Sequence, residues 1–417
     1  MDKIGGRAPL PAFGAARPDE PAAKRIKLDP PDSTQAQVAT QEPELNRRLK
    51  ENSTVYKGKI HQQTIFEDDP TAILDEDYRT WIVNAAYLYD SIFDISLVWP
   101  TLSCQWLPEY HIDKESLKSH LKLLAGTQTD GSEQNYLMLF DVTLPYIDDD
   151  LELPADEKLE QKLGDPTWRF SKKISHPSDV HRCQYCPAKT NIVATKSESG
   201  DVYLWDFDSA VSPSDQSNPD IPPVSVLKGS VGTGFALQWS VQIPYYVASG
   251  GDDKVVCLWD CAQLTKEIQP ATVLKGHSDS VQDVSFHCVN QELIASASTD
   301  KSVRLWDIRK PGEAPVKVDS YPGEVTCVEF HHTDPNKFIC GGTGKVIQNY
   351  DVRKATAPLH SMVGHDDDIM RLQWAPWSDT VVYSASSDKT SIVWDLSKVN
   401  FLFRRLDVKH RKIQNVK

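Results

Sequence analysis

In this chain of 417 residues, a pair made of an aromatic residue and an aspartate closes an alternating apolar run at six regularly spaced places. The pairs are Phe140-Asp141, Trp205-Asp206, Trp259-Asp260, Trp306-Asp307, Tyr350-Asp351 and Trp394-Asp395. Successive aspartates lie 65, 54, 47, 44 and 44 residues apart, and each pair closes an alternating apolar run. A repeat of about 40 to 45 residues is typical of one four-stranded blade of a β-propeller. The sequence therefore predicts an all-β propeller in which six repeats are visible.

Three further polar positions recur in fixed register with the aromatic residue of these pairs. The complete sets are His277, Ser296, Asp300 and Trp306, and His365, Ser384, Asp388 and Trp394. They resemble the buried hydrogen-bond relay of WD40 blades, in which imidazole, hydroxyl, carboxylate and indole satisfy one another. The same residue types could form a Ser-His-Asp catalytic triad, but a structural staple should repeat whereas a catalytic site should not. We therefore interpret the sets as structural and expect no enzyme activity.

Composition and periodicity divide the chain into four parts. Residues 1–72 have few aromatic residues and are rich in Pro, Gln, Asp and Lys, which predicts a disordered arm. Near-helical apolar spacing predicts an amphipathic helix over 73–94, followed by the propeller over 95–399 and a basic tail over 400–417. A seventh repeat would begin at His410, so we expect an incomplete ring that needs a partner, closes with six blades or has low thermal stability.

Charge and cysteine content limit the possible partners and compartment. The net charge is -14, which disfavours direct nucleic-acid binding and favours basic peptides. The apolar runs are shorter than the roughly 18 residues needed to span a bilayer, so no membrane segment is expected. The eight cysteines are scattered without the density of a secreted disulfide scaffold. These features favour reduced thiols and a place in the cytosol or nucleus.

Motifs for cofactor or metal chemistry are weak. Cys183 and Cys186 have the spacing of zinc ligands, but they lie on a predicted strand, where residues three apart face opposite sides. Residues 341–345 look like part of a phosphate loop, yet Val346 replaces the Ser or Thr that such a loop requires. We interpret this stretch as a hairpin turn and expect neither a cofactor nor a metal.

A compact basic cluster lies in the predicted arm. It contains Lys24, Arg25 and Lys27 and follows Pro21. An extended chain can present such residues to the acidic pockets of an import carrier, although an ordinary basic patch would look the same. We interpret the cluster as a nuclear import signal.

Several stretches resemble a known family. They are Tyr78-x-x-Trp81, Tyr87-Leu-Tyr-Asp90, Leu97-Val-Trp99-Pro100-Thr-Leu-x-x-Gln105-Trp106-Leu-Pro108, Gly126-Thr-Gln-Thr129, Asn191 to Lys196 and Trp394 to Lys398. This pattern is similar to the retinoblastoma-associated histone-binding WD40 proteins, the small subunits shared by chromatin assembly factor 1, histone acetyltransferase B, Polycomb and deacetylase complexes. The resemblance implies a non-catalytic nuclear scaffold whose partners are histones, their basic tails and other subunits of such complexes.

The resemblance also implies two histone-binding places. One is the acidic top of the ring, where the matching positions predict tail binding by Asp179, His181, Arg182, Phe235, Gln282, Glu324 and Asp368. Carboxylates occupy three of the five rim positions, whereas Thr233 and Ser280 occupy the others. Carboxylates at a dry channel mouth suit recognition of arginine, although they could equally be solvated turn residues.

The second implied place is a side groove against the N-terminal helix. Its residues here would be Trp81, Ile82, Tyr87 and Leu88. The acidic Pro-Pro loop that forms the other wall in the family is absent after Lys398, so the sequence keeps only the helix half of this groove.

A function of another class also fits the sequence. Trp306-Asp307-Ile-Arg309 and Tyr350-Asp351-Val-Arg353 resemble the WDxR motif of substrate receptors for cullin-RING ubiquitin ligases, in which the arginine docks on the adaptor. Arginine after the Trp-Asp pair is common in propellers generally, so affinity purification would have to decide between histones and a cullin adaptor.

Overall fold

The computed structural model describes part of the chain. The described residues are 97–129, 131–146, 166–208, 221–311, 316–397 and, for the backbone alone, 402–407. The predicted arm, the import cluster Lys24, Arg25 and Lys27, and the helix residues Trp81, Ile82, Tyr87 and Leu88 lie outside this part. Those predictions therefore stay predictions.

The described residues form six β-sheets, and β-sheet is the main regular structure among them. The first sheet contains β1 (Ser103–Asp113), β2 (Lys118–Gly126), β3 (Asn135–Pro145) and β4 (Thr167–His176). The second contains β5 (Val180–Cys186), β6 (Lys189–Ser197), β7 (Val202–Asp206), β8 (Ser225–Leu227) and β12 (Glu267–Ile268). The third contains β9 (Ala236–Trp239), β10 (Tyr246–Gly250), β11 (Val255–Asp260) and β13 (Thr272–Lys275).

The last three sheets have the same plan. The fourth contains β14 (Val281–Phe286), β15 (Leu293–Ser298), β16 (Val303–Asp307) and β17 (Val316–Val318). The fifth contains β18 (Val325–Phe330), β19 (Lys337–Gly342), β20 (Val346–Asp351) and β21 (His360–Val363), with the short 3-10 helix η1 (Val352–Lys354) between the last two. The sixth contains β22 (Ile369–Trp374), β23 (Val381–Ser386), β24 (Thr390–Asp395) and β25 (Leu402–Asp407).

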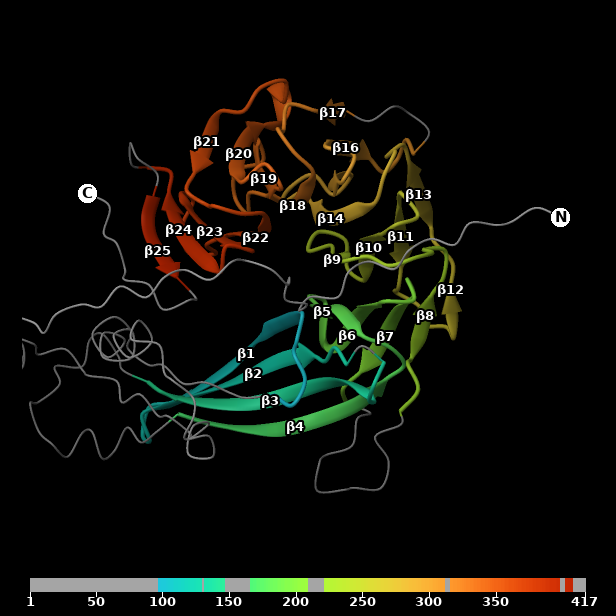
Figure 1. The fold of residues 1–417 in the computed structure, drawn as a ribbon. Coiled ribbons are helices and arrows are strands. Elements are labelled where there is room, and N and C mark those ends of the chain that lie inside the picture. The colour runs from blue at the N-terminus through green and yellow to red at the C-terminus, as the bar shows by residue number, and fades with distance from the viewer. Residues whose placement is uncertain are drawn as a thin grey trace, which may run out of the picture. The chain divides into compact units, whose positions relative to one another are not determined.

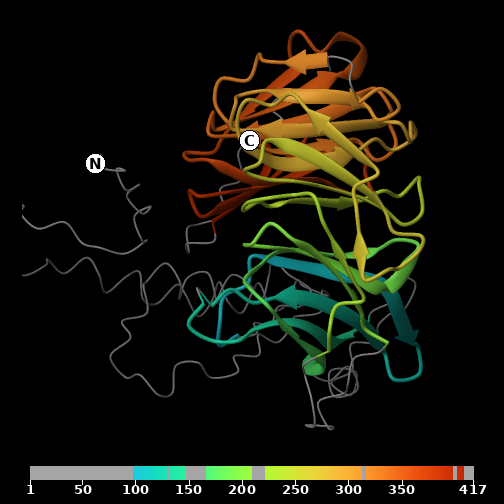
Figure 2. The same ribbon diagram turned by 90° about the vertical axis from the view of Figure 1, so that its right-hand side faces the viewer.

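This arrangement confirms the predicted WD40 propeller with six visible blades. Each sheet is a meander of antiparallel strands, and β12 adds to the second sheet as a short parallel strand. The first strand of each sheet, which we call its inner strand, packs on the first strand of the next in the series β1, β5, β9, β14, β18 and β22. Figures 1 and 2 show the six blades following one another in this order.

The sixth blade extends beyond the boundary that the sequence predicts. The sequence predicts that the propeller ends at residue 399 and that a basic tail follows, but β25 pairs with β24 from Asp407 opposite Thr390 to Leu402 opposite Trp394. The edge of β24 carries free backbone groups, and a fourth strand satisfies them as in the other blades. The basic residues Arg404 and Arg405 concealed the strand pattern in the sequence.

Apolar side chains fill the space between consecutive blades. One cluster joins Leu124 and Ile174 of the first blade to Val193 and Trp205 of the second, and similar clusters join each later pair of blades. Trp205, Trp259, Trp306 and Trp394 of the repeated pairs are buried. The repeat is therefore a packing unit, because the closing aromatic residues of the second to sixth blades lie in clusters shared with a neighbouring blade.

The predicted relay is present in the fourth and sixth blades. In the fourth, the His277 ring contacts the Asp300 carboxylate at 2.8 Å and the Ser296 hydroxyl at 2.7 Å, and Ser296 accepts the Trp306 indole N–H at 2.8 Å. In the sixth blade His365 makes the same contacts to Asp388 and Ser384, at 3.0 and 2.7 Å. The repetition confirms the structural interpretation of these residues.

The other blades vary the relay. In the second blade the Thr195 hydroxyl lies 2.9 Å from Nε2 of His176 and accepts the Trp205 indole N–H at 2.8 Å. Nδ1 of His176 lies 2.6 Å from the Ser178 carbonyl, so in the neutral ring Nδ1 carries the proton and Nε2 accepts. In the fifth blade Tyr350 instead donates to Gln348 at 2.6 Å.

This geometry predicts an acid-sensitive second blade. Burial lowers the pKa of His176 to about 4. An unfolded histidine titrates near 6.5, so between pH 6.5 and 4 the unfolded chain binds a proton that the folded chain excludes, and stability falls as the pH falls. We expect His176 to account for roughly 2 to 3 kcal/mol of this loss.

Urea unfolding at pH 7 and pH 4.5 measures the effect. His176→Gln should be less stable than the wild type at pH 7 but should lose less stability on acidification. His111→Gln, at an exposed position, is the control and should keep the wild-type pH dependence. An unchanged pH dependence in His176→Gln would contradict the assignment.

Candidate functional site

The predicted tail-binding residues lie at or near the start of the inner strands. His181 and Arg182 belong to β5, Gln282 belongs to β14, and Phe235 immediately precedes β9. Glu324 and Asp368 lie in the turns that lead into β18 and β22. We call the end of the propeller formed by these turns the rim. The structure therefore places residues from five blades around one end of the ring.

An aromatic pair lies at the rim between the second and third blades. The His181 and Phe235 rings are stacked with their centroids 4.7 Å apart and an interplanar angle of 16°. His181 is buried and its Nδ1 lies 3.3 Å from the Gly234 carbonyl, whereas Phe235 is 40% exposed. The exposed face of Phe235 is thus held by a buried neighbour and can pack on a ligand.

Asp179 does not have the environment that the sequence suggests. Its side chain is buried and accepts hydrogen bonds from the Thr129 backbone N–H at 3.0 Å and from the Asn135 amide at 2.7 Å. The carboxylate therefore fastens the first blade to the start of the second and is not free to receive a cation. Sequence position alone could not reveal these partners, because they come from a loop and a strand about 50 residues earlier.

Glu324 and Asp368 are better placed to meet a cation. Glu324 is exposed and Asp368 is partly exposed, and neither carboxylate forms an ion pair with another described residue. Their neighbourhood also contains the pairs Lys254 with Asp279 at 3.9 Å and Lys345 with Asp367 at 3.8 Å, each linking one blade to the next. The rim thus combines free carboxylates with carboxylates that are already neutralised.

Lys345 also defines the structure of residues 341–345. It has a φ of 60° in the turn between β19 and β20, and Lys254, Lys301 and Lys389 occupy the same place in other blades with similar angles. The turn is a repeated hairpin connection, as predicted, and a strand follows it where a phosphate loop requires a helix.

A buried charge cluster spans the inner strands below the rim. One oxygen of Asp283 lies 3.1 Å from an Arg371 nitrogen, and the other lies 3.6 Å from an Arg182 nitrogen. Glu329 accepts the Trp374 backbone N–H at 2.8 Å. The cluster joins the second, fourth, fifth and sixth blades, so it fixes blades that do not touch one another directly.

Two of the four charged groups in this cluster, Glu329 and Arg182, have strongly shifted pKa values. Burial raises the pKa of Glu329 to about 7, and burial together with Arg371 lowers the pKa of Arg182 to about 10. Arg182 therefore remains a cation at neutral pH. Because its guanidinium faces Asp283, Arg182 serves the ring rather than a ligand.

Sequence reasoning selected Arg182 but missed Asp283, Glu329 and Arg371. Arg182, Asp283 and Arg371 occupy the same position in three different inner strands, six residues after the first relay position of each repeat. Charged residues at an inner-strand position that is apolar in other blades were the available signal.

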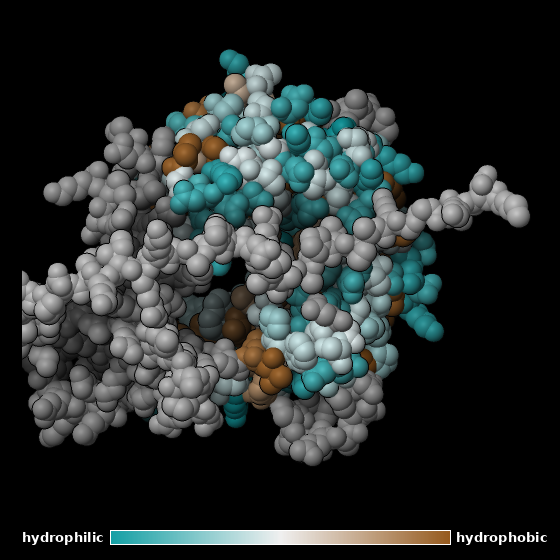
Figure 3. Space-filling view, in the orientation of Figure 1, coloured by the Kyte–Doolittle hydropathy of each residue, from teal (hydrophilic) through white to brown (hydrophobic). Residues whose placement is uncertain are grey.

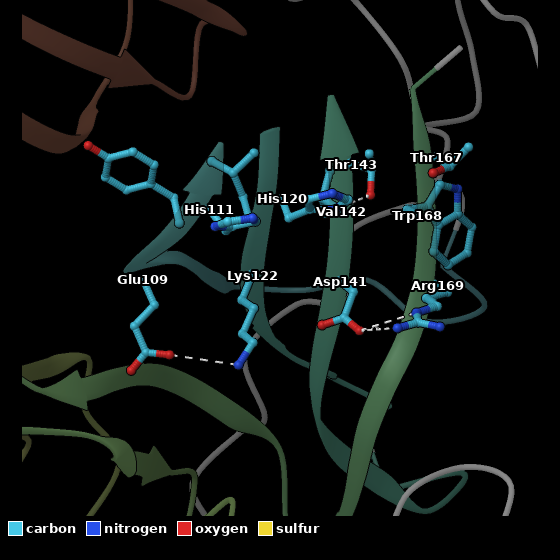
Figure 4. Close-up of a pocket in the computed structure, with 12 residues that line it drawn as sticks. Glu109, His111, His120, Lys122, Asp141, Val142, Thr143, Thr167, Trp168 and Arg169 are labelled. Carbon is cyan, nitrogen blue, oxygen red and sulfur yellow. Dashed lines mark hydrogen bonds and ion pairs between the residues drawn. The ribbon is translucent and has the colours of Figure 1, made fainter. Parts of the chain in front are cut away.

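A surface pocket of about 730 Å³ lies elsewhere, on the far part of the first blade. It is lined by Glu109, Tyr110, His111, His120, Leu121, Lys122, Asp141, Val142, Thr143, Thr167, Trp168 and Arg169. Figure 4 shows Glu109 directed at Lys122, and Asp141 at Arg169, along β1 to β4. None of the predicted tail-binding residues lines this pocket, and its paired charges leave no strong net field.

The structure also gives the surroundings of the two cysteines that have the spacing of zinc ligands. Cys183 and Cys186 are both buried, and burial raises the pKa of both thiols. Within the described ranges no group of three or more His, Cys, Asp or Glu side chains could hold a metal ion, and no helix is long and apolar enough to cross a membrane. The face drawn in Figure 3 is mainly hydrophilic over the described blades.

The arginines of the two WDxR motifs are engaged inside the chain. Arg309 contacts Asp307 at 2.6 Å and Glu292 at 2.8 Å, and Arg353 contacts Asp351 at 2.6 Å. Both arginines are exposed, and each forms a two-pronged pair with the aspartate of its own motif. This is a local turn structure, so the motif gives no separate support to an adaptor-binding function.

Comparison with known proteins agrees with the fold. Residues 223–260, 268–307 and 356–395 match the WD domain, G-beta repeat. The chain is thus a protein of the WD40-repeat class. Residues 76–146 match the family described as the histone-binding protein RBBP4 or a subunit of the CAF1 complex. The chain is therefore similar to this family over residues 76–146.

Two relatives carry the same name, histone acetyltransferase type B subunit 2. The protein from Candida glabrata is 29% identical over 333 residues, which cover 78% of this chain and 76% of the relative. The protein from Schizosaccharomyces pombe is 36% identical over 196 residues, which cover 46% of this chain and 45% of the relative. The second match therefore spans less than half of that relative's length.

Proposed function

We propose that this chain is a non-catalytic histone-binding subunit of a chromatin assembly or chromatin-modifying complex that works in the nucleus. The match of residues 76–146 to a family described as histone-binding carries the proposal. Two relatives named as subunits of a histone acetyltransferase support the same class of complex. The net charge of -14 suits a basic partner such as a histone.

We place the histone tail at the rim. Glu324 and Asp368 supply carboxylates without a described ion-pair partner, and Phe235 supplies an exposed aromatic face. Gln282 donates to the Ser280 hydroxyl at 2.9 Å, which orients its amide oxygen for a peptide N–H. A cationic side chain can pair with the carboxylates while its aliphatic part packs on the ring.

Charge reversal tests this placement. Glu324→Lys combined with Asp368→Lys should weaken binding of a synthetic Arg- and Lys-rich histone-tail peptide by about tenfold in low salt, because two attractions become repulsions. Calorimetric titration at two salt concentrations measures the effect, and the difference should shrink in high salt. Asp179 is excluded from this variant because its buried carboxylate supports the fold.

The matched control reverses two exposed carboxylates away from the rim. The control variant Glu115→Lys with Glu267→Lys makes the same change in net charge. Glu115 lies in a turn and Glu267 on the short strand β12, and both side chains are exposed. This control should bind the peptide within about twofold of the wild type. Equal weakening in both double variants would show that net charge, and not the rim, governs binding.

A further inference from the structure

The carboxyl group of Glu329 lies among charged side chains inside the ring. Glu329 belongs to β18, the inner strand of the fifth blade, which packs on β14 and on β22. Three other inner strands contribute the charges that act on it, namely Arg182 of β5, Asp283 of β14 and Arg371 of β22. The surroundings of this carboxyl group are therefore set by four blades.

Glu329 lacks the ion pairs that its neighbour Asp283 has. One oxygen of Asp283 lies 3.1 Å from an Arg371 nitrogen and the other lies 3.6 Å from an Arg182 nitrogen. Glu329 forms no ion pair with another residue that the structure describes, and it accepts the backbone N–H of Trp374 at 2.8 Å. A neutral N–H compensates a carboxylate for lost water less well than a guanidinium does, so the protonated form of Glu329 is favoured.

These surroundings make the carboxyl group titrate near neutral pH. Burial raises the pKa of Glu329 to about 7, and the Asp283 carboxylate acts in the same direction. Arg371, Arg182 and the Trp374 N–H act in the opposite direction without cancelling the effect of burial. The cluster thus holds two cations and one anion below this pH, and it gains a second anion when Glu329 ionises.

The rim lies at one end of the same inner strands. Glu324 is in the turn that leads into β18, five residues before Glu329, and Asp368 is three residues before Arg371. A strand rises about 3.3 Å per residue, so at most about 16 Å separates Glu324 from Glu329. One unit charge at that distance changes the affinity for a bound cation by about twofold to threefold in low salt.

We propose that Glu329 is a proton-linked switch for tail binding at the rim, in which the ionised form strengthens binding of a basic histone tail and the protonated form weakens it. This regulation rests on the proposed function of the rim. The arginine and lysine side chains of a tail keep their charges between pH 6 and 8. By reciprocity a bound tail favours the ionised form of Glu329, so binding releases part of a proton near neutral pH.

The first test uses the full chain without a ligand. Glu329→Gln keeps an acceptor for the Trp374 N–H but cannot ionise. An unfolded glutamate titrates near pH 4.3, so between this pH and about 7 the folded wild type binds a proton that the unfolded chain has lost, and stability falls as the pH rises. In urea, the unfolding equilibrium constant of the wild type relative to Glu329→Gln should rise at least tenfold from pH 5.5 to pH 8.

The matched control for this test is Glu115→Gln, at an exposed position in a turn. Relative to this control, the wild-type unfolding constant should stay nearly the same across the same pH range. A constant ratio of wild type to Glu329→Gln, in chains that circular dichroism shows to be folded, would overturn the proposal.

The second test measures binding. A synthetic Arg- and Lys-rich histone-tail peptide without histidine is titrated into the full chain by calorimetry in low salt. The wild type should bind about twofold to threefold more tightly at pH 8 than at pH 6, and Glu329→Gln should lose this difference. At pH 7, titrations in two buffers of different ionisation enthalpy should show about a quarter of a proton more released by the wild type than by the variant, as a threefold coupling requires.

The outcomes separate this regulation from the proposed function of the rim. Binding with the same pH dependence and the same proton release in the wild type and in Glu329→Gln would overturn the switch but leave the rim as the binding site. Absence of peptide binding at both pH values would overturn the proposed function, and the switch with it.

Discussion

Replacing Asp283 by asparagine is expected to lower the free energy of unfolding by about 3 to 5 kcal/mol, the usual cost of removing one partner from a buried ion pair. The Asp283 side chain is 4% exposed and lies between Arg182 and Arg371. Its neutralisation removes the carboxylate that forms an ion pair with Arg182, whose side chain is 15% exposed. Because the cluster joins four blades, the loss should be felt across the ring.

Urea unfolding followed by circular dichroism measures this change. Asp319→Asn is the matched control, because Asp319 pairs with Lys317 at 3.5 Å but its side chain is 72% exposed. An exposed pair contributes about 1 kcal/mol or less, so this control should unfold close to the wild-type midpoint. Similar shifts in the two variants would contradict the structural role of the cluster.

Replacing Trp306 by alanine should cost about 3 to 5 kcal/mol, the range for removing a large buried aromatic side chain. Trp306 is 2% exposed, and its indole N–H donates to Ser296 in the relay of the fourth blade. The variant therefore creates a cavity and leaves a buried hydroxyl with one partner fewer.

A second tryptophan provides the control for this variant. Trp377 lies in the turn between β22 and β23 and is 83% exposed, so Trp377→Ala should change stability by about 0.5 kcal/mol or less. Thermal unfolding of both variants measures the difference. If Trp306→Ala unfolds at the same temperature as Trp377→Ala and the wild type, the tryptophan of the repeated Trp-Asp pair does not hold the blades together.

The sequence was sufficient to predict the structural features that recur in each repeat. Trp306 and Trp394, with their serine and histidine partners, recur at fixed spacing, so the blade and its relay could be derived without coordinates. The closing strand β25 could not be predicted because its basic residues do not alternate with apolar ones. Pairing with the open edge of β24 determines that strand, and such pairing depends on tertiary position.

The site was less predictable for a related reason. Position in the repeat selected Glu324 and Asp368, which lie in turns that lead into β18 and β22. The same rule also selected Asp179, which the fold uses for internal hydrogen bonds. Whether a carboxylate is free or satisfied depends on partners that are distant in sequence. The link between Asp283 and Arg371, which are 88 residues apart, is invisible to any local pattern for this reason.

Titration of the purified full-length chain with purified core histones by calorimetry tests the central claim most directly. We predict a saturable complex in low salt whose affinity falls steeply as salt rises, because acidic groups of the chain meet basic groups of the histones. A folded chain that produces no binding heat with histones in low salt, and that leaves them unbound in a parallel sedimentation experiment, would contradict the proposed histone-binding function.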